Sequence, residues 1–140
     1  MEKVDRAHFC PGVPGVYQDC PQSINYNVTI SAPHMHAYCM EWMKQKLVPG
    51  ARVLDVGCGS GYLCATFYEM TVKDEKANVI GIEHIEELAQ FSRDNLKNAG
   101  YSSQMENGNI KVVCGDGRQG YKEGAPYDAI HVGAAAHPVP

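Results

Sequence analysis

Residues 52–61, R-V-L-D-V-G-C-G-S-G, constrain the fold of this chain more than any other stretch. Aliphatic residues follow a Pro49-Gly50 turn and predict a short buried strand. Glycines at 57, 59 and 61 come directly after it, and helix-compatible residues occupy 62–70. Because glycine lets a ligand approach the backbone closely, a strand, a glycine loop and a helix N-terminus together predict a site for a nucleotide-like cofactor.

The spacing of these glycines narrows the choice of cofactor. Dinucleotide-binding proteins use G-x-G-x-x-G, whereas this loop is G-x-G-x-G and follows Asp55. It looks like the first motif of S-adenosylmethionine-dependent methyltransferases, in which the acidic residue and the glycine loop face the methionine part of the cofactor. A glycine turn without a ligand is the alternative on these residues alone, and the missing sixth-position glycine disfavours a nicotinamide-dependent dehydrogenase.

Composition excludes several classes of protein. The chain has 140 residues, enough for one domain. Its net charge is −4 and it has no basic run, so it lacks the positive surface that nucleic-acid-binding proteins use. No apolar run approaches the ~20 residues of a membrane span. The charged start M-E-K-V-D-R is not a secretory signal. Six cysteines without C-x-x-C spacing predict reduced thiols and no metal site, and we expect a cytoplasmic location.

Apolar periodicity predicts strands at 28–30, 52–56, 79–82, 110–114 and 127–132, and helices at 31–47, 62–70 and 85–99. Residues 101–109 and 119–126 are expected to be loops, the second with at most one weak helical turn. Residues 1–27 form an extended N-terminal arm with one helical turn near Asp5, and 28–140 form the cofactor-binding core. This alternation predicts a single α/β domain of Rossmann-like type, with a mostly parallel sheet and helices on both faces.

The helix at 31–47 carries two further expectations. Ser31 is predicted as its N-cap, with Pro33 in the first turn, or alternatively its hydroxyl points at a substrate carboxylate. Apolar residues recur at every fourth position and predict a stripe that faces the core. That stripe consists of Met35, Cys39, Met43 and Leu47.

Several candidate ligand contacts fall at the carboxyl ends of the predicted strands, where parallel sheets bind their ligands. They are the glycine loop, Glu83-His84, Asp116-Gly117 and residues 133–136. Glu83 can accept hydrogen bonds from both hydroxyls of a ribose, or it is a solvated acid that opens a helix. Asp116 and the Gly117 amide can recognise an adenine, or they form a plain Asp-Gly turn.

Longer strings in the chain resemble one particular family. Y-x-D-C-P-Q-S-I, V-T-I-S-A-P-H-M-H-A-Y, L-D-V-G-C-G-S-G-Y-L, V-I-G-I-E-H-I-E-E-L, V-V-C-G-D-G-R-Q-G-Y and A-P-Y-D-A-I-H-V-G-A-A-A occur in this order. Together they resemble the protein-L-isoaspartate (D-aspartate) O-methyltransferases, from about residue 5 onward. The T-I-S-A-P-H-M-H and Y-D-A-I-H-V-G-A-A-A strings are more specific than the glycine loop.

The resemblance implies an enzyme that methylates the α-carboxyl of L-isoaspartyl and D-aspartyl residues in damaged proteins, with S-adenosyl-L-methionine as the methyl donor. Ser31 matches the catalytic serine of the family. Cys58 stands where relatives have serine, and Glu83 where many have aspartate. With the first motif included, the implied cofactor-binding positions are Val28, Thr29, Ile30, Ser31, His36, Asp55, Gly57, Gly59, Ser60, Gly61, Glu83, His84, Asp116 and Gly117.

Relative to that family, the chain is expected to be incomplete on the C-terminal side of the sheet and at its N-terminus. The family likeness suggests a monomer, but strand 127–132 would be an exposed apolar edge that favours association. We therefore expect the chain alone to bind the cofactor weakly or not at all and to methylate poorly. The alternatives are an inactive fragment that binds partners through its open edge and a small-molecule S-adenosylmethionine methyltransferase; the T-I-S-A-P-H-M-H string disfavours the latter.

Overall fold

A parallel sheet organises the structure, a computed structural model that describes residues 1–73 and 77–134. Its strands are β3 (Arg52–Val56), β4 (Asn78–Glu83), β5 (Ile110–Cys114) and β6 (Ala129–Val132). They lie in the order β5-β4-β3-β6, and every adjacent pair is parallel. The predicted parallel sheet is therefore confirmed, and β3, which precedes the glycine loop, lies inside it.

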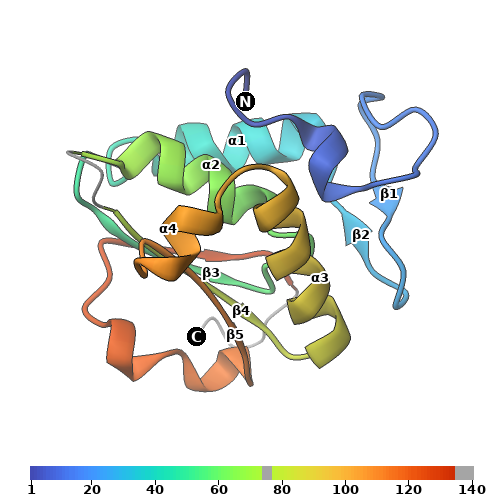
Figure 1. Cartoon of the computed structure of the whole chain (residues 1–140). Helices are drawn as coiled ribbons and strands as arrows, with labels where there is room; N and C mark the ends of the chain where they lie inside the picture. The colour runs from blue at the N-terminus through green and yellow to red at the C-terminus, as the bar shows by residue number, and fades with distance from the viewer. Residues whose placement is uncertain (74–76, 135–140) are drawn as a thin grey trace.

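The two faces of the sheet are covered differently. In Figure 1 the α-helices lie on one side of the sheet: α1 (Pro33–Met43), α2 (Tyr62–Thr71), α3 (Glu86–Asn98) and α4 (Ser102–Glu106). The main core forms there because Val53, Val79 and Ile110 point toward α2 and α3 and are fully buried. The other face carries Leu54, Ile80 and Ile82.

Two 3-10 turns, η2 (Gly117–Gln119) and η3 (Lys122–Gly124), lie on that second face, drawn in orange in Figure 1. Tyr121 and Tyr127 of this segment pack on Leu54, Ile80 and Ile82. The Tyr127 hydroxyl donates to the Tyr121 carbonyl at 2.6 Å, which holds the segment against the sheet. Helices were predicted for both faces of the sheet. Within residues 1–73 and 77–134, α-helices cover one face, and the 3-10 turns η2 and η3 lie on the other.

The N-terminal arm packs against the helices. Its one helical turn, η1 (Arg6–Phe9), was predicted near Asp5, and the Asp5 carboxylate caps it through the Ala7 amide at 2.9 Å. Phe9 is fully buried beside Tyr62, with ring centroids 5.4 Å apart. Further along, β1 (Gln22–Ser23) pairs antiparallel with β2 (Thr29–Ile30). The chain leaves β2 directly into Ser31 and α1.

Helix α1 differs from the prediction in its cap, its end and its buried face. Ala32 is the N-cap and no side chain caps the helix, because the helix begins at Pro33, which leaves Ser31 one position too early. Regular helix stops at Met43 rather than 47. The buried residues are His36 and Met40, whereas Met35 is 45% exposed. The first half of the predicted stripe is therefore wrong: His36 and Met40 are buried, each one position after the predicted Met35 and Cys39, because His36 packs on Tyr62.

Two other segments also differ. Helix α4 occupies part of the stretch that was expected to be a loop, because Tyr101 and Met105, four positions apart, both pack on the main core. Strand β6 begins at Ala129 rather than 127, since Tyr127 turns onto the second face of the sheet. None of the helices in the described part of the chain is long and apolar enough to cross a membrane.

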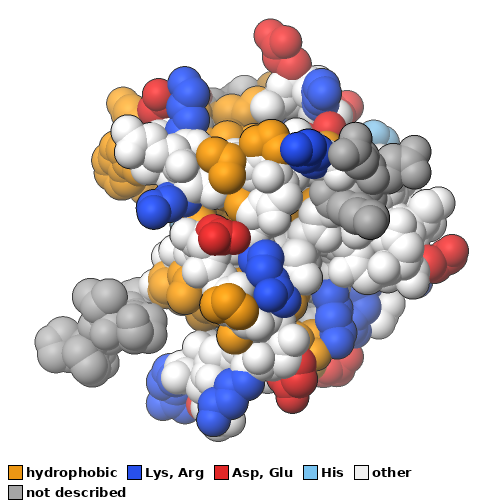
Figure 2. Space-filling model, turned by 90° about the vertical axis from the view of Figure 1, so that its left-hand side faces the viewer, with side chains coloured by type: hydrophobic (Ala, Val, Ile, Leu, Met, Phe, Trp, Pro, Cys, Tyr) orange, Lys and Arg blue, Asp and Glu red, His pale blue; other side chains and the backbone are white. Residues whose placement is uncertain are grey.

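Charged side chains of both signs are interspersed on the face of the molecule that Figure 2 shows. Lys and Arg do not gather into one large basic area among the described residues of this face. Small groups of hydrophobic side chains lie between them. Trp42 of α1 is the most exposed of the large hydrophobic residues, at 79%.

Gly81 in β4 is a position where a methyl group has no room. A Cβ added there would lie 2.8 Å from the Cys64 sulfur and 2.9 Å from both Cβ and the sulfur of Cys58. We expect Gly81→Ala to lower the free energy of unfolding by about 1–3 kcal/mol, because overpacking forces the glycine loop and α2 to shift. Urea unfolding measures this change. Gly115→Ala is the matched control, since no described heavy atom lies within 4 Å of its added Cβ, and equal losses in both variants would contradict the explanation.

Candidate functional site

The glycine loop that follows β3 takes a conformation that requires its glycines. Gly57, Gly59 and Gly61 have φ of +79°, +54° and +86°, a region that side chains with a Cβ rarely adopt. The amides of Gly57 and Cys58 both donate to the Ile82 carbonyl at the end of β4, at 2.8 and 3.0 Å. The loop is therefore fixed to the neighbouring strand, and Gly61 becomes the N-cap of α2.

A cavity of about 60 Å³ lies beside this loop. Elements far apart in the sequence contribute to it: β2, α1, β3, α2 and β6. The predicted site residues that line it are Thr29, Ile30, Ser31, His36, Asp55, Gly57, Gly59 and Ser60. Cys58 of the predicted glycine loop and Gly133 of the predicted stretch 133–136 also line it, whereas the lining residues Tyr62, Leu63 and His131 were not predicted.

Ser31 is exposed and lies between β2 and α1 at the edge of this cavity. Its hydroxyl has no hydrogen-bond partner within residues 1–73 and 77–134. Because it caps no helix, the hydroxyl is available to a ligand. Neither cavity histidine is hydrogen-bonded to it: His36 is bonded to Arg6, and His131 to Asp55.

Asp55 and His131 form a buried ion pair at the base of the cavity. The Asp55 Oδ1 and His131 Nδ1 atoms are 2.7 Å apart, and the two side chains are 2% and 13% exposed. Cys64 also donates its thiol to Asp55 Oδ2, at 3.6 Å. Burial lowers the pKa of His131, but its hydrogen bond to Asp55 and the Asp55 charge outweigh this and raise the pKa above the ordinary value.

His36 has the opposite electrostatic environment. Burial, then the charge of Arg6 and that of His131, lower the pKa of His36 to about 3, so its ring is neutral at physiological pH. The ring stacks on Tyr62, with centroids 4.8 Å apart and planes 30° apart. The cavity thus contains one neutral and one charge-stabilised histidine.

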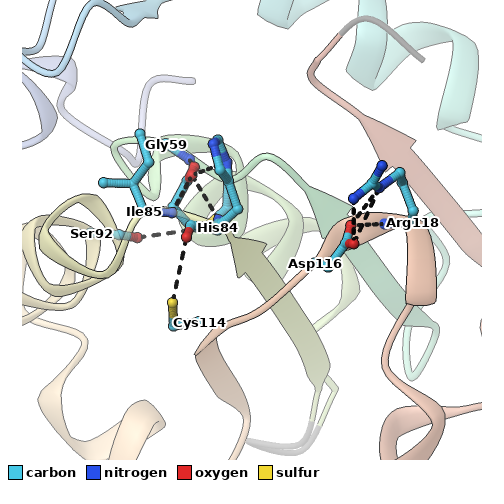
Figure 3. Close-up of polar contacts among 9 residues, drawn as sticks. Gly59, His84, Ile85, Ser92, Cys114, Asp116 and Arg118 are labelled. Carbon is cyan, nitrogen blue, oxygen red and sulfur yellow. Dashed lines mark hydrogen bonds and ion pairs between the residues drawn. The ribbon is translucent and has the colours of Figure 1, made fainter.

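Glu83 lies outside the cavity lining but is bonded to its loop. Its Oε2 accepts from the Gly59 amide at 3.2 Å, and its Oε1 accepts from the amides of His84 and Ile85 at 2.8 and 3.2 Å. Figure 3 shows Gly59, His84 and Ile85 around these contacts. The carboxylate, only 4% exposed, ties the glycine loop to the start of α3, a structural role that sequence reasoning missed.

Asp116 and Gly117 follow β5 on the same rim of the sheet, since the Gly115 amide donates to the Glu83 carbonyl at 2.9 Å. Asp116 accepts from the amide, Nε and Nη2 of Arg118, as Figure 3 shows. The Arg118 side-chain hydrogen bonds, followed by its amide, lower the pKa of Asp116 to about 2. In this structure the acceptor capacity of Asp116 is largely taken up by Arg118.

The remaining predicted residues have peripheral positions. Val28 precedes β2 and is half-buried in the core, Gly61 is buried at the helix N-terminus, and His84 is exposed beside Glu83. Of the predicted strand-end stretch 133–136, Gly133 lines the cavity, and Ala135 and Ala136 lie outside the described residues. His131 is the main omission; its signal was the alternation of Y-D-A-I-H-V, which places it on the Asp55 face of the sheet.

No group of three or more His, Cys, Asp or Glu side chains that could hold a metal ion occurs in the described part of the chain. All six cysteines are free. The cavity combines a glycine loop, a buried acid and a hydroxyl without a hydrogen-bond partner in the described part of the chain.

Comparisons with known proteins place this geometry in a family. Residues 1–140 match the family model "Protein-L-isoaspartate(D-aspartate) O-methyltransferase (PCMT)". Over its full length the chain is 52% identical to protein-L-isoaspartate O-methyltransferase 1 of Arabidopsis thaliana and 49% identical to the Caenorhabditis elegans protein-L-isoaspartate O-methyltransferase. It covers 60% of each of these two relatives.

A solved structure has the same fold. A Plasmodium falciparum chain, described as a protein-L-isoaspartate O-methyltransferase in complex with S-adenosyl-L-homocysteine, superposes with a TM-score of 0.89 at 35% identity. The match covers 99% of this chain and 65% of that one. The fold predicted from the strand and helix alternation, that of S-adenosylmethionine-dependent methyltransferases, is thereby confirmed. The chain belongs to the protein-L-isoaspartate (D-aspartate) O-methyltransferase family.

Proposed function

We propose that this chain carries the cofactor site and the catalytic serine of a protein repair methyltransferase. The reaction would transfer the methyl group of S-adenosyl-L-methionine to the α-carboxyl of L-isoaspartyl and D-aspartyl residues in damaged proteins or peptides. The observation that carries this proposal is that Ser31 and the glycine loop line one cavity, although 25 residues separate Ser31 from Gly57. The names of its relatives support the same activity.

The residues around the cavity suit one end of the cofactor. Its volume of about 60 Å³ is far below the ~300–1,000 Å³ of pockets that enclose a whole small molecule. We therefore assign the cavity to the methionine part, held by Asp55, His36 and the glycine loop with Ser60. Glu83 would take the ribose and Asp116 with Gly117 the adenine along the open strand-end rim; the remaining assigned positions are Val28, Thr29, Ile30, Gly61 and His84.

The chemistry asks little of the protein beyond orientation. S-adenosylmethionine, when bound, supplies an electrophilic sulfonium methyl group. A substrate carboxyl has a reference pKa near ~4 and is already a nucleophile at pH 7. Ser31 can therefore act by donating its hydroxyl to one carboxylate oxygen and directing the other along the line of attack. The lack of contact between Ser31 and the histidines, among the described side chains, fits a positioning role rather than a proton relay.

Two other assignments have weaker support. A small-molecule methyltransferase would share the glycine loop but not the T-I-S-A-P-H-M-H string. A catalytically weak methyltransferase of the same family is the other. We also propose a cytoplasmic location, which the six free cysteines favour.

Methyl transfer to an isoaspartyl peptide, measured beside its aspartyl twin with labelled cofactor, tests the activity. We expect label on the isoaspartyl peptide only. Ser31→Ala should lower kcat/KM by about 10- to 100-fold, because a hydrogen bond to a charged group contributes about 1.5–3 kcal/mol. Ser103→Ala, an exposed serine of α4, is the control. Equal labelling of both peptides would exclude repair, and no labelling of either would favour the catalytically weak methyltransferase.

Glu83→Gln tests the ribose assignment. We expect the affinity for S-adenosyl-L-homocysteine to fall about tenfold or more, since the amide carries no charge and places an N–H against a backbone N–H. Isothermal titration calorimetry gives the affinity, and thermal unfolding shows whether the fold survives. Glu87→Gln changes an exposed acid at the start of α3 and should bind like the parent; unchanged affinity in Glu83→Gln would refute the assignment.

Ile130→Lys tests association through β6. In the described sheet β6 has a strand on one side only, and Ile130 on it is 56% exposed. We expect the lysine to reduce concentration-dependent association, because an edge charge opposes strand pairing. Sedimentation velocity over a range of concentrations measures this. Val48→Lys, at a 49% exposed loop position, is the control; the edge is not an interface if both variants associate as the parent does.

A further inference from the structure

Arg6 is a buried cation that has no close ion pair, although its charge also acts on Asp19 at longer range. It is 4% exposed, and no described carboxylate lies within ion-pair distance of it. The nearby acids are engaged elsewhere: Asp5 accepts from Ala7 and Tyr17, and Asp19 accepts from His34. Because a buried charge is costly unless it is well bonded, such a residue requires an explanation.

The contacts of Arg6 lead to His36. Its Nε donates to the Val16 carbonyl at 3.0 Å, and its Nη1 lies 3.4 Å from Nδ1 of His36. Its Nη2 is buried and has no partner among the described residues. Arg6 itself does not line the cavity, whereas His36 does. The hydrogen bond to His36 is therefore the contact through which Arg6 can position a group that lines the cavity.

The contact fixes the proton of the His36 ring. A guanidinium only donates hydrogen bonds, so Nδ1 of His36 must accept. A neutral imidazole has one N–H, so the proton is on Nε2. That atom has no hydrogen-bond partner within the described chain, and the stacked Tyr62 ring fixes the plane of the imidazole. His36 can thus offer a donor, and not an acceptor, to a ligand in the cavity.

The charges along the cavity suggest which ligand group this donor meets. The Arg6 guanidinium lies against His36, and no described carboxylate lies within ion-pair distance of it. The Asp55 carboxylate, which also lines the cavity, is already paired with His131. A ligand carboxylate is therefore favoured beside His36, because the charge behind that ring is positive.

We propose that Arg6 is a positioning residue that holds His36 in its Nε2–H tautomer, so that His36 donates to a carboxylate in the cavity beside Ser31. The proposal rests on the proposed function for the source of that carboxylate. It belongs either to the methionine part of the cofactor or to the isoaspartyl substrate. The tautomer itself does not depend on that function.

Nuclear magnetic resonance of the uniformly 15N-labelled chain tests the tautomer directly, through long-range couplings between ring protons and ring nitrogens. We expect Nδ1 of His36 to resonate as an unprotonated nitrogen and Nε2 as a protonated one, and the ring to remain neutral as the pH falls from 7 to 5. A His36→Leu variant identifies the signals. In Arg6→Met the pKa of His36 should rise, because a nearby positive charge is removed, while Arg6→Lys should lie between the two. A protonated Nδ1 in the parent, or the same tautomer and titration in Arg6→Met, would overturn the proposal.

A double-mutant cycle separates positioning from mere stability. Affinity for S-adenosyl-L-homocysteine and for an isoaspartyl peptide is measured in Arg6→Met, His36→Leu and the double variant. We expect Arg6→Met to weaken one ligand about tenfold in the parent and to have no further effect on it in His36→Leu. Loss of the first ligand identifies the cofactor carboxylate, and loss of the second identifies the substrate. His34→Gln, an exposed histidine of the same helix, should leave both unchanged. Equal effects of Arg6→Met in both backgrounds, or none on either ligand, would contradict the proposal.

Discussion

The bonding between the glycine loop and the end of β4 is the constraint on which the site depends. The amides of Gly57 and Cys58 donate to the Ile82 carbonyl, and the Glu83 carboxylate accepts from Gly59. These bonds hold the loop in left-handed conformations that only glycine adopts at low cost. They also fix the position of the first turn of α2, because Gly61 at the end of the loop is the N-cap of that helix. Without them the strand ends would not enclose a cavity against β2 and α1.

The fold could be predicted from the sequence because its signals are local. Short apolar strands such as 110–114 and 79–82, separated by a helix with an apolar face, leave few topologies other than a parallel sheet. The errors occur where tertiary contacts override local preference. Ser31 had the right chemistry for an N-cap, but Pro33 set the start of the helix one residue later. Tyr101 and Met105 formed a helical turn because both reach the core.

The candidate site was only partly predictable, for a related reason. Motif positions identified the glycine loop, Ser31 and His36, which line one cavity. What a motif does not contain is the partner of each side chain. Asp55 was expected to face the cofactor, yet 76 residues separate it from His131, its closest partner. Glu83 likewise combines its predicted position with a structural role toward three backbone amides.

The two histidines that line the cavity have pKa values shifted in opposite directions. Burial lowers the pKa of both rings; for His131 the Asp55 carboxylate outweighs burial, whereas for His36 the Arg6 guanidinium lowers the pKa further. Both effects need low solvent exposure, since water would screen them. The N-terminal arm therefore belongs to the site as much as the sheet does. Arg6 of the arm is hydrogen-bonded to His36, and β6 supplies His131, which pairs with Asp55.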